Sequence, residues 1–276
     1  MSSKAVAWTL LAAVAFTTVL LFNHWAAYQP LSTLLYSGIV LALCGLANIV
    51  LPFRFLGVHK RAVGALVLVG GVALTTAAVF WPAAMIRVAQ PKTRLDEIMP
   101  EYQFSERHAA RIHARPDQVI VAIRQSTFGD MKSLMTLLKI RGAALRIHRT
   151  GDFLQDKRIL DAFSESGYIF GGSEHEIEMV GVWNVRANRR PEVRTLQEVA
   201  DYRAQGAVKM GYNFTVQEAG AGWSTIVAET RVVALDESSR GFARYWRFIV
   251  PGSGILRLQW LEGIKRRAES MANPRL

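Results

Sequence analysis

Hydrophobic residues gather in three long uncharged runs at the beginning of the chain. The runs cover residues 5–22, 31–53 and 62–86, and each approaches or exceeds the roughly 20 residues that a helix needs to cross the bilayer hydrocarbon. No small-x-small cleavage site follows the first run, which argues against a removed signal peptide. The pattern therefore predicts three transmembrane helices in a module over residues 1–87.

The loops between these runs differ in positive charge. Residues 54–61 contain three basic side chains, whereas residues 23–30 contain no Lys or Arg. Because basic loops tend to stay in the cytoplasm, we expect the amino terminus and the second loop inside. The rest of the chain would then lie outside a bacterial inner or plasma membrane, in the periplasm or its equivalent. The basic residues between positions 87 and 94 favour the opposite orientation.

After a short polar linker over residues 88–100, the hydrophobic pattern changes to shorter segments. Residues 104–112 and 208–216 alternate apolar and polar side chains, as half-buried strands do. The pattern thus predicts an α+β domain over residues 101–276. The other expected elements are strands over 168–171, 175–186 and 223–235, a turn at Gly171-Gly172, and short helices over 116–125, 130–141, 157–163 and 196–203.

The longest periodic segment is the last one, from Asp236 to Ser270. The period continues in phase through Pro251, so we expect one long helix that bends at this proline. Most of its positive charge is expected off the apolar stripe; the basic residues are Arg240, Arg244, Arg247, Arg257, Lys265, Arg266 and Arg267. The stripe consists of large residues at steps of three, four or seven: Phe242, Tyr245, Trp246, Ile249, Leu256, Trp260 and Ile264.

Charge is distributed unevenly along the chain. The sequence has 33 basic and 22 acidic residues, and residues 1–86 contain no Asp or Glu. The basic surplus matches no nucleic-acid-binding motif, so we expect it to face lipid headgroups and expect no nucleic-acid partner. The only cysteine, Cys44, lies inside the second run, which excludes a disulfide framework and a thiolate metal site. No cofactor is expected.

Three stretches of the sequence resemble an uncharacterised bacterial branch of the START-like, or SRPBCC, superfamily. They are 211–214 (Gly-Tyr-Asn-Phe), 229–232 (Glu-Thr-Arg-Val) and 244–254 (Arg-Tyr-Trp-Arg-Phe-Ile-Val-Pro-Gly-Ser-Gly). The order of elements over roughly residues 100–268 is similar too. The resemblance implies a helix-grip fold, in which a curved antiparallel sheet surrounds the final helix, usually with an apolar cavity. It implies no single activity, because the superfamily includes binding, transport and catalysis.

Six residues are candidates for a ligand-binding site, since strand and helix faces should meet around them. Most large apolar residues of such a domain form its core, and some of these six are expected to line a pocket. The candidates are Trp183, Met210, Tyr212, Phe214, Trp246 and Ile249.

Glu106 and His108 are two residues apart on one expected strand and therefore share a face. A carboxylate beside an imidazole in an apolar setting is suited to acid–base chemistry. The preferred interpretation is that the strand lies at a sheet edge, where both side chains reach water. We therefore assign no catalytic residue.

Two further groups of charged residues have structural interpretations. Glu174, Glu176 and Glu178 share one strand face, but no second histidine lies at a ligand spacing, so we expect a solvated face and no metal site. Glu229 and Arg231 share a face and are expected to form an ion pair across the sheet.

These observations predict a membrane-anchored, non-catalytic domain that binds a lipid or another apolar small molecule. One alternative is a structural or assembly subunit of a larger membrane protein complex. A less favoured alternative is a cyclase-like or hydrolytic enzyme with Glu106 and His108 in its pocket.

Overall fold

The computed structural model spans residues 1–276 and forms two compact units. The first predicted span, residues 5–22, and most of the helix predicted over residues 130–141 lie outside the described residues. The helical unit is Met1–Pro82 with Arg244–Gly252, and the sheet unit is Ala83–Ala243 with Ser253–Leu276. The structure describes residues 30–51, 60–132, 134, 136, 155–237 and 240–273.

The helical unit contains α2 (Pro30–Val50) and α3 (Arg61–Phe80), both long and apolar enough to cross a membrane. Glycines let the two helices approach closely, since a Cβ added at Gly38 would lie 2.7 Å from the backbone nitrogen of Thr75. Helix α3 ends before the predicted residue 86, because Pro82 follows and Ile86–Arg87 forms β1.

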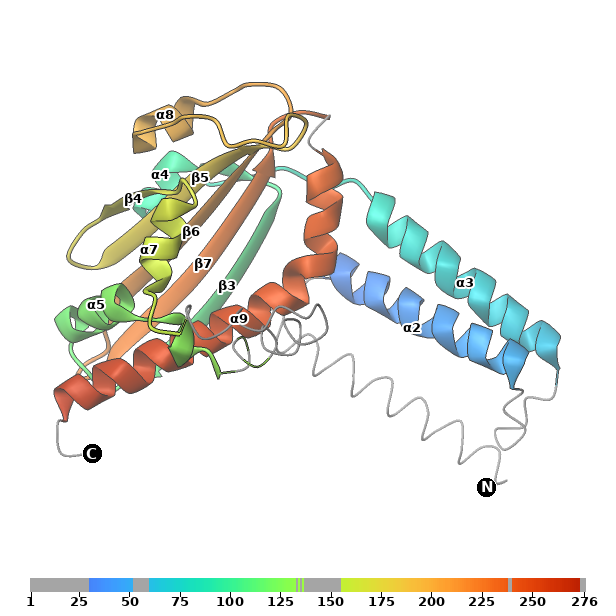
Figure 1. Ribbon diagram of the computed structural model, residues 1–276, viewed down its shortest axis with the longest axis horizontal. Coiled ribbons are helices and arrows are strands. Elements are labelled where there is room, and N and C mark those ends of the chain that lie inside the picture. Colours follow the sequence, from blue (N-terminus) through green and yellow to red (C-terminus); the bar gives the residue numbers. More distant parts are fainter. Residues whose placement is uncertain are drawn as a thin grey trace. The chain divides into compact units, whose positions relative to one another are not determined.

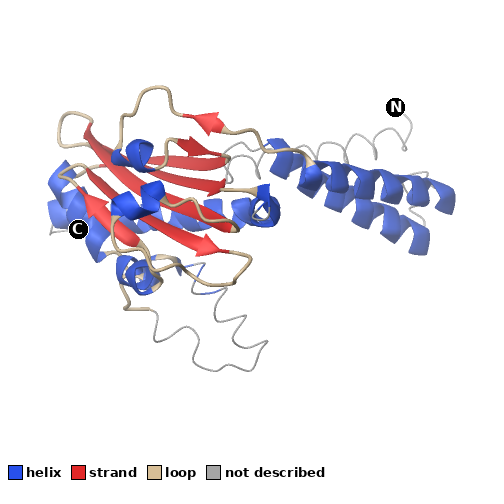
Figure 2. Ribbon diagram, turned by 90° about the horizontal axis from the view of Figure 1, so that it is seen from above, coloured by secondary structure: helices blue, strands red, loops and turns tan. Residues whose placement is uncertain are grey.

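The sheet unit contains a five-stranded antiparallel sheet with the order β3-β7-β6-β5-β4 (Figures 1 and 2). Among the strands that the structure describes, β3 pairs only with β7 and therefore lies at an edge. Strand β4 continues to Gly172, so the turn predicted at Gly171-Gly172 instead follows it. The strands are β3 (Phe104–Ile112), β4 (Ile169–Gly172), β5 (Glu176–Asn184), β6 (Ala207–Glu218) and β7 (Ser224–Ala234).

One face of this sheet, the outer face, is covered by two short helices, α4 (Arg94–Ile98) and α8 (Leu196–Asp201). Helix α4 falls in the segment expected to be a polar linker, and β2 (Glu101–Tyr102) follows it and pairs with β1. Gly211 makes room for α4, since a Cβ there would lie 2.6 Å from side-chain atoms of α4 and Met99. The core on this face consists of Leu95, Ile98, Met99, Val180, Val182, Val199, Ala207 and Val233.

Helix α9 (Arg240–Ala272) is one helix as predicted, and its part from Ser253 onward packs against the inner face of the sheet (Figure 1). Trp260 of α9 contacts Phe214 of β6 edge-to-face, with ring centroids 4.7 Å apart. Trp260 also donates a hydrogen bond to Ser126, just after α5, over 2.8 Å. The remaining helices are α5 (Pro116–Gln125), the short 3₁₀ helix η2 (Phe128–Asp130) and α7 (Ile159–Glu165).

Candidate functional site

A cluster of polar side chains lies on the inner face of the sheet. Tyr212 on β6 pairs with Thr230 on β7, which in turn pairs with Glu106 on β3, so the three form a row across the strands. His108 follows Glu106 on the same face. Arg257 of α9 lies over the Tyr212 ring, with its Cζ atom 4.3 Å from the ring centroid. We call these five residues the inner polar cluster.

Glu106 and His108 form a buried pair. His108 Nε2 lies 2.7 Å from Glu106 Oε1, and the two residues are only 8% and 1% exposed. The expectation that both reach water is therefore wrong, although β3 is an edge strand as predicted. Their side chains point to the face that α9 covers. Glu106 Oε2 is buried and has no hydrogen-bond partner.

Arg257 is buried without an ion-pair partner among the described residues, although the Glu106 carboxylate belongs to the same cluster. Its residue exposure is 6%, Nη1 has no hydrogen-bond partner, and no residue that the structure describes forms an ion pair with it. Burial lowers the pKa of Arg257, which the nearby Tyr212, Glu106 and Tyr168 oppose. A guanidinium nevertheless stays charged in proteins. A charge held in an apolar interior costs several kcal/mol unless it is paired, so this position favours an anion.

Aromatic and apolar side chains surround the cluster. Thr230 Oγ1 is fully buried and, like Glu106 Oε2, has no partner. Tyr168 packs 5.6 Å from the Tyr212 ring, and burial raises its pKa well above the ordinary value of 10.0. The cluster is therefore a group of polar side chains within an apolar interior that excludes water. Its aromatic wall consists of Phe163, Tyr168, Tyr212, Phe214 and Trp260.

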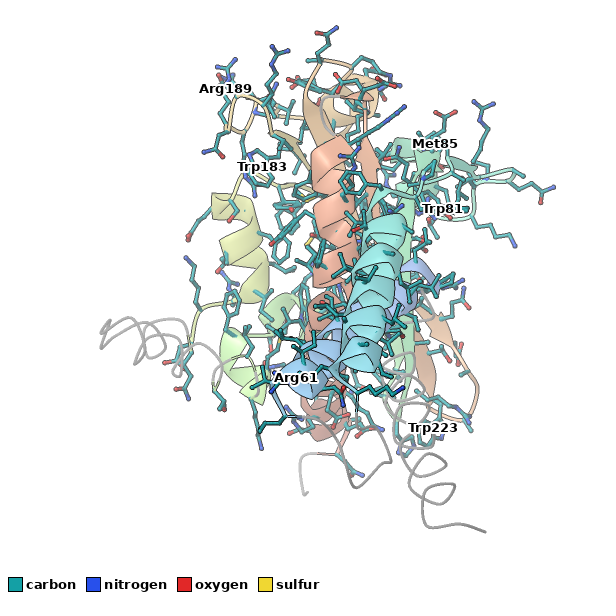
Figure 3. All side chains as sticks on the ribbon, turned by 90° about the vertical axis from the view of Figure 1, so that its right-hand side faces the viewer. Arg61, Trp81, Met85, Trp183, Arg189 and Trp223 are labelled. Carbon is teal, nitrogen blue, oxygen red and sulfur yellow. The ribbon has the colours of Figure 1, made fainter. Side chains whose placement is uncertain are left out.

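The structure divides the six residues predicted to bind ligand between the two units. Met210, Tyr212 and Phe214 lie on the inner face of β6, and Trp183 on β5 contacts Phe242 edge-to-face (Figure 3). Trp246 and Ile249 instead lie on the part of α9 that belongs to the helical unit. The expectation that one set of strand and helix faces unites all six stays a prediction for these two.

The part of α9 in the helical unit carries a second buried arginine, Arg247, which is 2% exposed. It donates hydrogen bonds to the carbonyl oxygens of Ala78 and Val79 over 2.7 Å each, and to that of Trp81 over 2.6 Å. These carbonyls at the end of α3 have no partner within the helix. Arg247 thus caps α3.

The sequence placed most of the basic side chains of α9 off the apolar stripe, and Arg247 and Arg257 are buried exceptions. The spacing in the sequence could have indicated this burial. The buried residues of α9 recur at steps of three and four, and both arginines fall in that series. These residues are Arg247, Val250, Gly254, Arg257, Leu261, Ile264 and Ala268.

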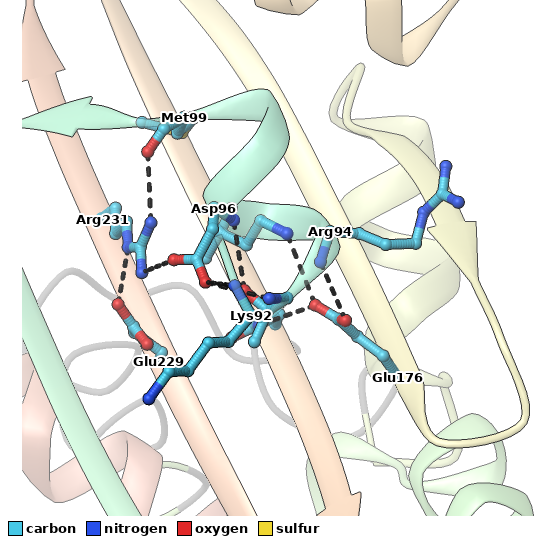
Figure 4. Close-up of polar contacts among 10 residues, drawn as sticks. Lys92, Arg94, Asp96, Met99, Glu176, Glu229 and Arg231 are labelled. Carbon is cyan, nitrogen blue, oxygen red and sulfur yellow. Dashed lines mark hydrogen bonds and ion pairs between the residues drawn. The ribbon is translucent and has the colours of Figure 1, made fainter. Parts of the chain in front are cut away.

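The outer face carries a different polar network (Figure 4), centred on Arg231. Arg231 donates to Asp96 over 2.5 Å, to Glu229 over 2.6 Å and to the Met99 carbonyl over 3.1 Å. The predicted ion pair with Glu229 is present, but it joins two residues of one strand, β7, and does not cross the sheet. Burial would raise the pKa of Asp96, but hydrogen bonds from the Lys92 and Thr93 amides and from Arg231 hold that pKa below its usual value.

Glu176 and Glu178 belong to the same outer network and are buried, which corrects the expectation of a solvated face. Glu176 accepts hydrogen bonds from the Arg94 amide over 3.0 Å and from Asn213 over 2.8 Å, while Glu178 pairs with the Arg94 side chain over 2.8 Å. Burial raises the pKa of Glu178, which Arg94 opposes and Glu176 reinforces. The network fixes α4 on the sheet, and no group of metal-binding side chains occurs among the described residues.

A cleft of about 650 Å³ lies elsewhere, near the carboxyl end of α9. His113 stacks there on Trp223, with ring centroids 4.6 Å apart, and Glu269 accepts a hydrogen bond from the His113 amide. Trp223 is labelled in Figure 3. The polar groups that the structure describes here already have partners or face solvent. The inner polar cluster is therefore the better candidate site.

Comparison with known proteins adds no assignment. No protein-family model matches the chain, and no curated protein or solved structure is significantly similar to it. The function must therefore be argued from the geometry of the two units.

Proposed function

We propose that the protein is a membrane-anchored domain that binds a lipid or another small, largely apolar molecule between its sheet and α9. The observation that carries this proposal is a set of three neighbouring buried atoms without partners: Glu106 Oε2, Thr230 Oγ1 and Arg257 Nη1. Buried polar atoms in folded proteins nearly always have partners. Three such atoms in one place, within an aromatic wall, support a molecule bound there as their partner.

The apolar surface of α2 and α3 supports the membrane anchor. Large hydrophobic residues are exposed along both helices, as expected for side chains that contact lipid: Leu34, Val40, Leu41, Leu43, Leu46, Val63, Leu66, Val69 and Val72. A third span over residues 5–22 completes the proposed anchor. The positive charge of residues 54–61 then puts the sheet unit outside the cytoplasm of a bacterial inner membrane.

The order of elements supports membership of the START-like superfamily with a helix-grip fold. One edge strand precedes a meander of four antiparallel strands, and a long final helix lies against the inner face. A binding role fits this arrangement, because a helix on one face of a sheet separates from it more easily than two paired strands do.

Native mass spectrometry of the gently extracted full-length protein tests the proposal. We expect one small-molecule adduct per chain, and we expect it to be lost after organic extraction and restored by adding back the extract. Protein that carries no adduct but is bound to other membrane proteins would contradict the proposal. That result would support the alternative role of an assembly subunit.

A second candidate function, an enzyme, is favoured by the short contact between Glu106 and His108. A carboxylate bonded to one imidazole nitrogen orients the ring and leaves the other nitrogen for proton transfer. If the bound molecule is also turned over, His108→Gln should abolish its conversion while the adduct remains. An adduct recovered unchanged after long incubation with the wild-type protein would exclude this candidate.

A further inference from the structure

We infer that the molecule bound at the inner polar cluster is an amphipathic carboxylic acid whose carboxylate pairs with Arg257. This inference rests on the proposed function, because it names the chemistry of the ligand at the same site. It begins from the charge of Arg257, which is 6% exposed and paired with no described side chain.

The two buried arginines of α9 differ in their hydrogen bonds, and this difference indicates the charge of the ligand. Arg247 donates three hydrogen bonds through Nη1 and Nη2, so burying this cation in the helical unit is compensated. Arg257 is also buried, but its guanidinium lies against aromatic rings instead of hydrogen-bond acceptors. Its Cζ atom is 4.3 Å from the ring centroid of Tyr212 and 5.6 Å from that of Trp260. Rings offset only part of the cost of a desolvated charge. The missing partner of Arg257 is therefore an anion.

The charges around Arg257 favour a carboxylate over a phosphate. Within the inner polar cluster Arg257 is the one permanent cation, while Glu106 lies close enough to act on it electrostatically. Arg190, which stacks on Tyr168 with Cζ 4.9 Å from the ring centroid, is exposed. A single guanidinium balances one negative charge, and its planar fork matches the two oxygens of a carboxylate. A doubly charged phosphate would bring a second negative charge beside Glu106, and no further cation of the cluster would balance it.

The surroundings of Arg257 indicate that the rest of the ligand is apolar. Phe214, Trp260 and Met210 border the cluster and are buried. Only Thr230 Oγ1 and Glu106 Oε2 remain as nearby buried polar atoms without partners. A hydrocarbon chain contacts such a wall without losing hydrogen bonds, whereas a polar molecule such as a sugar would leave many groups unsatisfied.

Three probes that share one hydrocarbon chain test this inference: hexadecanoic acid, hexadecan-1-ol and hexadecyl phosphate. Each is titrated at neutral pH against delipidated full-length protein in detergent, and occupancy is read by native mass spectrometry. We expect the acid to bind at least about tenfold more tightly than the alcohol, because only the acid forms a charge-assisted pair. We expect the phosphate to bind more weakly than the acid.

Variants separate the role of Arg257 from general effects of charge. Arg257→Met should remove the preference for the acid and leave alcohol binding intact, and Arg257→Lys should keep part of the preference. Arg240→Met, which removes a half-exposed cation from the same helix, should behave as wild type. Equal binding of acid and alcohol, a preference for the phosphate, or an unchanged preference in Arg257→Met would overturn the inference and leave the binding function standing. Failure of all three probes to bind the wild-type protein would overturn both.

Discussion

The two faces of the sheet bury arginines in opposite ways. On the outer face Arg231 bonds to Asp96, Glu229 and the Met99 carbonyl, whereas on the inner face Arg257 bonds to no described group. Glu178 Oε2 is the exception on the outer face. On the outer face the buried charge has hydrogen-bond partners, and these bonds hold α4 in position on the sheet. A buried charge without partners indicates a position for something that the chain does not supply.

Removing the outer arginine should have the largest effect on stability. Arg231→Met leaves Asp96 and Glu229 buried without their cation, so we expect the free energy of unfolding to fall by about 3–5 kcal/mol. Chemical denaturation of the full-length protein in detergent measures this loss. Arg87→Met breaks an exposed pair with Glu101 and should cost no more than about 1 kcal/mol. Similar losses for both variants would contradict a structural role for the outer network.

The buried Lys209 on the outer face makes the stability depend on pH. It donates a 2.6 Å hydrogen bond to the Ala200 carbonyl at the end of α8. Burial, with a contribution from Arg203, lowers its pKa from 10.5 to about 8. Between these values the unfolded chain binds more protons than the folded one, so stability rises with pH. Across this pH range the free energy of unfolding of the wild-type protein should rise by on the order of 2 kcal/mol relative to that of Lys209→Met. If the free energy of unfolding of the wild type and of Lys209→Met changed with pH in parallel, Lys209 would not be desolvated.

The inner arginine should respond in the opposite direction from the outer one. Arg257→Met replaces an unpartnered buried charge by an apolar side chain of similar length, so we expect the ligand-free protein to be stabilised by about 1–2 kcal/mol. Thermal unfolding of delipidated protein measures the change. A loss as large as that of Arg231→Met would mean that Arg257 is compensated within the chain, and the comparison between the faces would fail.

The smallest expected effect concerns two buried hydroxyls. Thr230→Val keeps the shape of the side chain and removes an oxygen without a partner, so it should change stability by less than about 1 kcal/mol, in the stabilising direction. Ser126→Ala removes a hydroxyl that donates to the Ile123 carbonyl and accepts from Trp260, and should cost about 1–3 kcal/mol. Equal losses in denaturation experiments would show that Thr230 has a partner.

Much of the fold could be predicted because its strands alternate cleanly. The strand over residues 104–112 was predicted with the bounds that it has, and α9 was predicted as one helix. Helix α4 was missed because five residues are too few for a visible period. Its capping box, in which Thr93 and Asp96 bond to each other's backbone, was nevertheless present in the sequence as a start signal.

The inner polar cluster was harder to predict, because burial depends on contacts between distant elements. Glu106 and His108 look solvent-exposed on an edge strand until α9 covers their face. The role of Arg247 depends on the end of α3, far away in the sequence. The period that includes Arg257 was visible, but a cation within a buried stripe is unexpected unless a ligand is considered.

The position of β3 at the sheet edge has a consequence for synthesis of the protein. Strand β3 is made well before β7, which is its partner among the described strands. Until then the emerging β3 presents open backbone groups that invite pairing with strands of other molecules. Glu106, Arg107 and Arg111 place charges on both of its faces, and charged strands pair poorly with foreign ones. The same glutamate that lies buried in the inner polar cluster of the finished domain thus helps to keep the growing chain from aggregating.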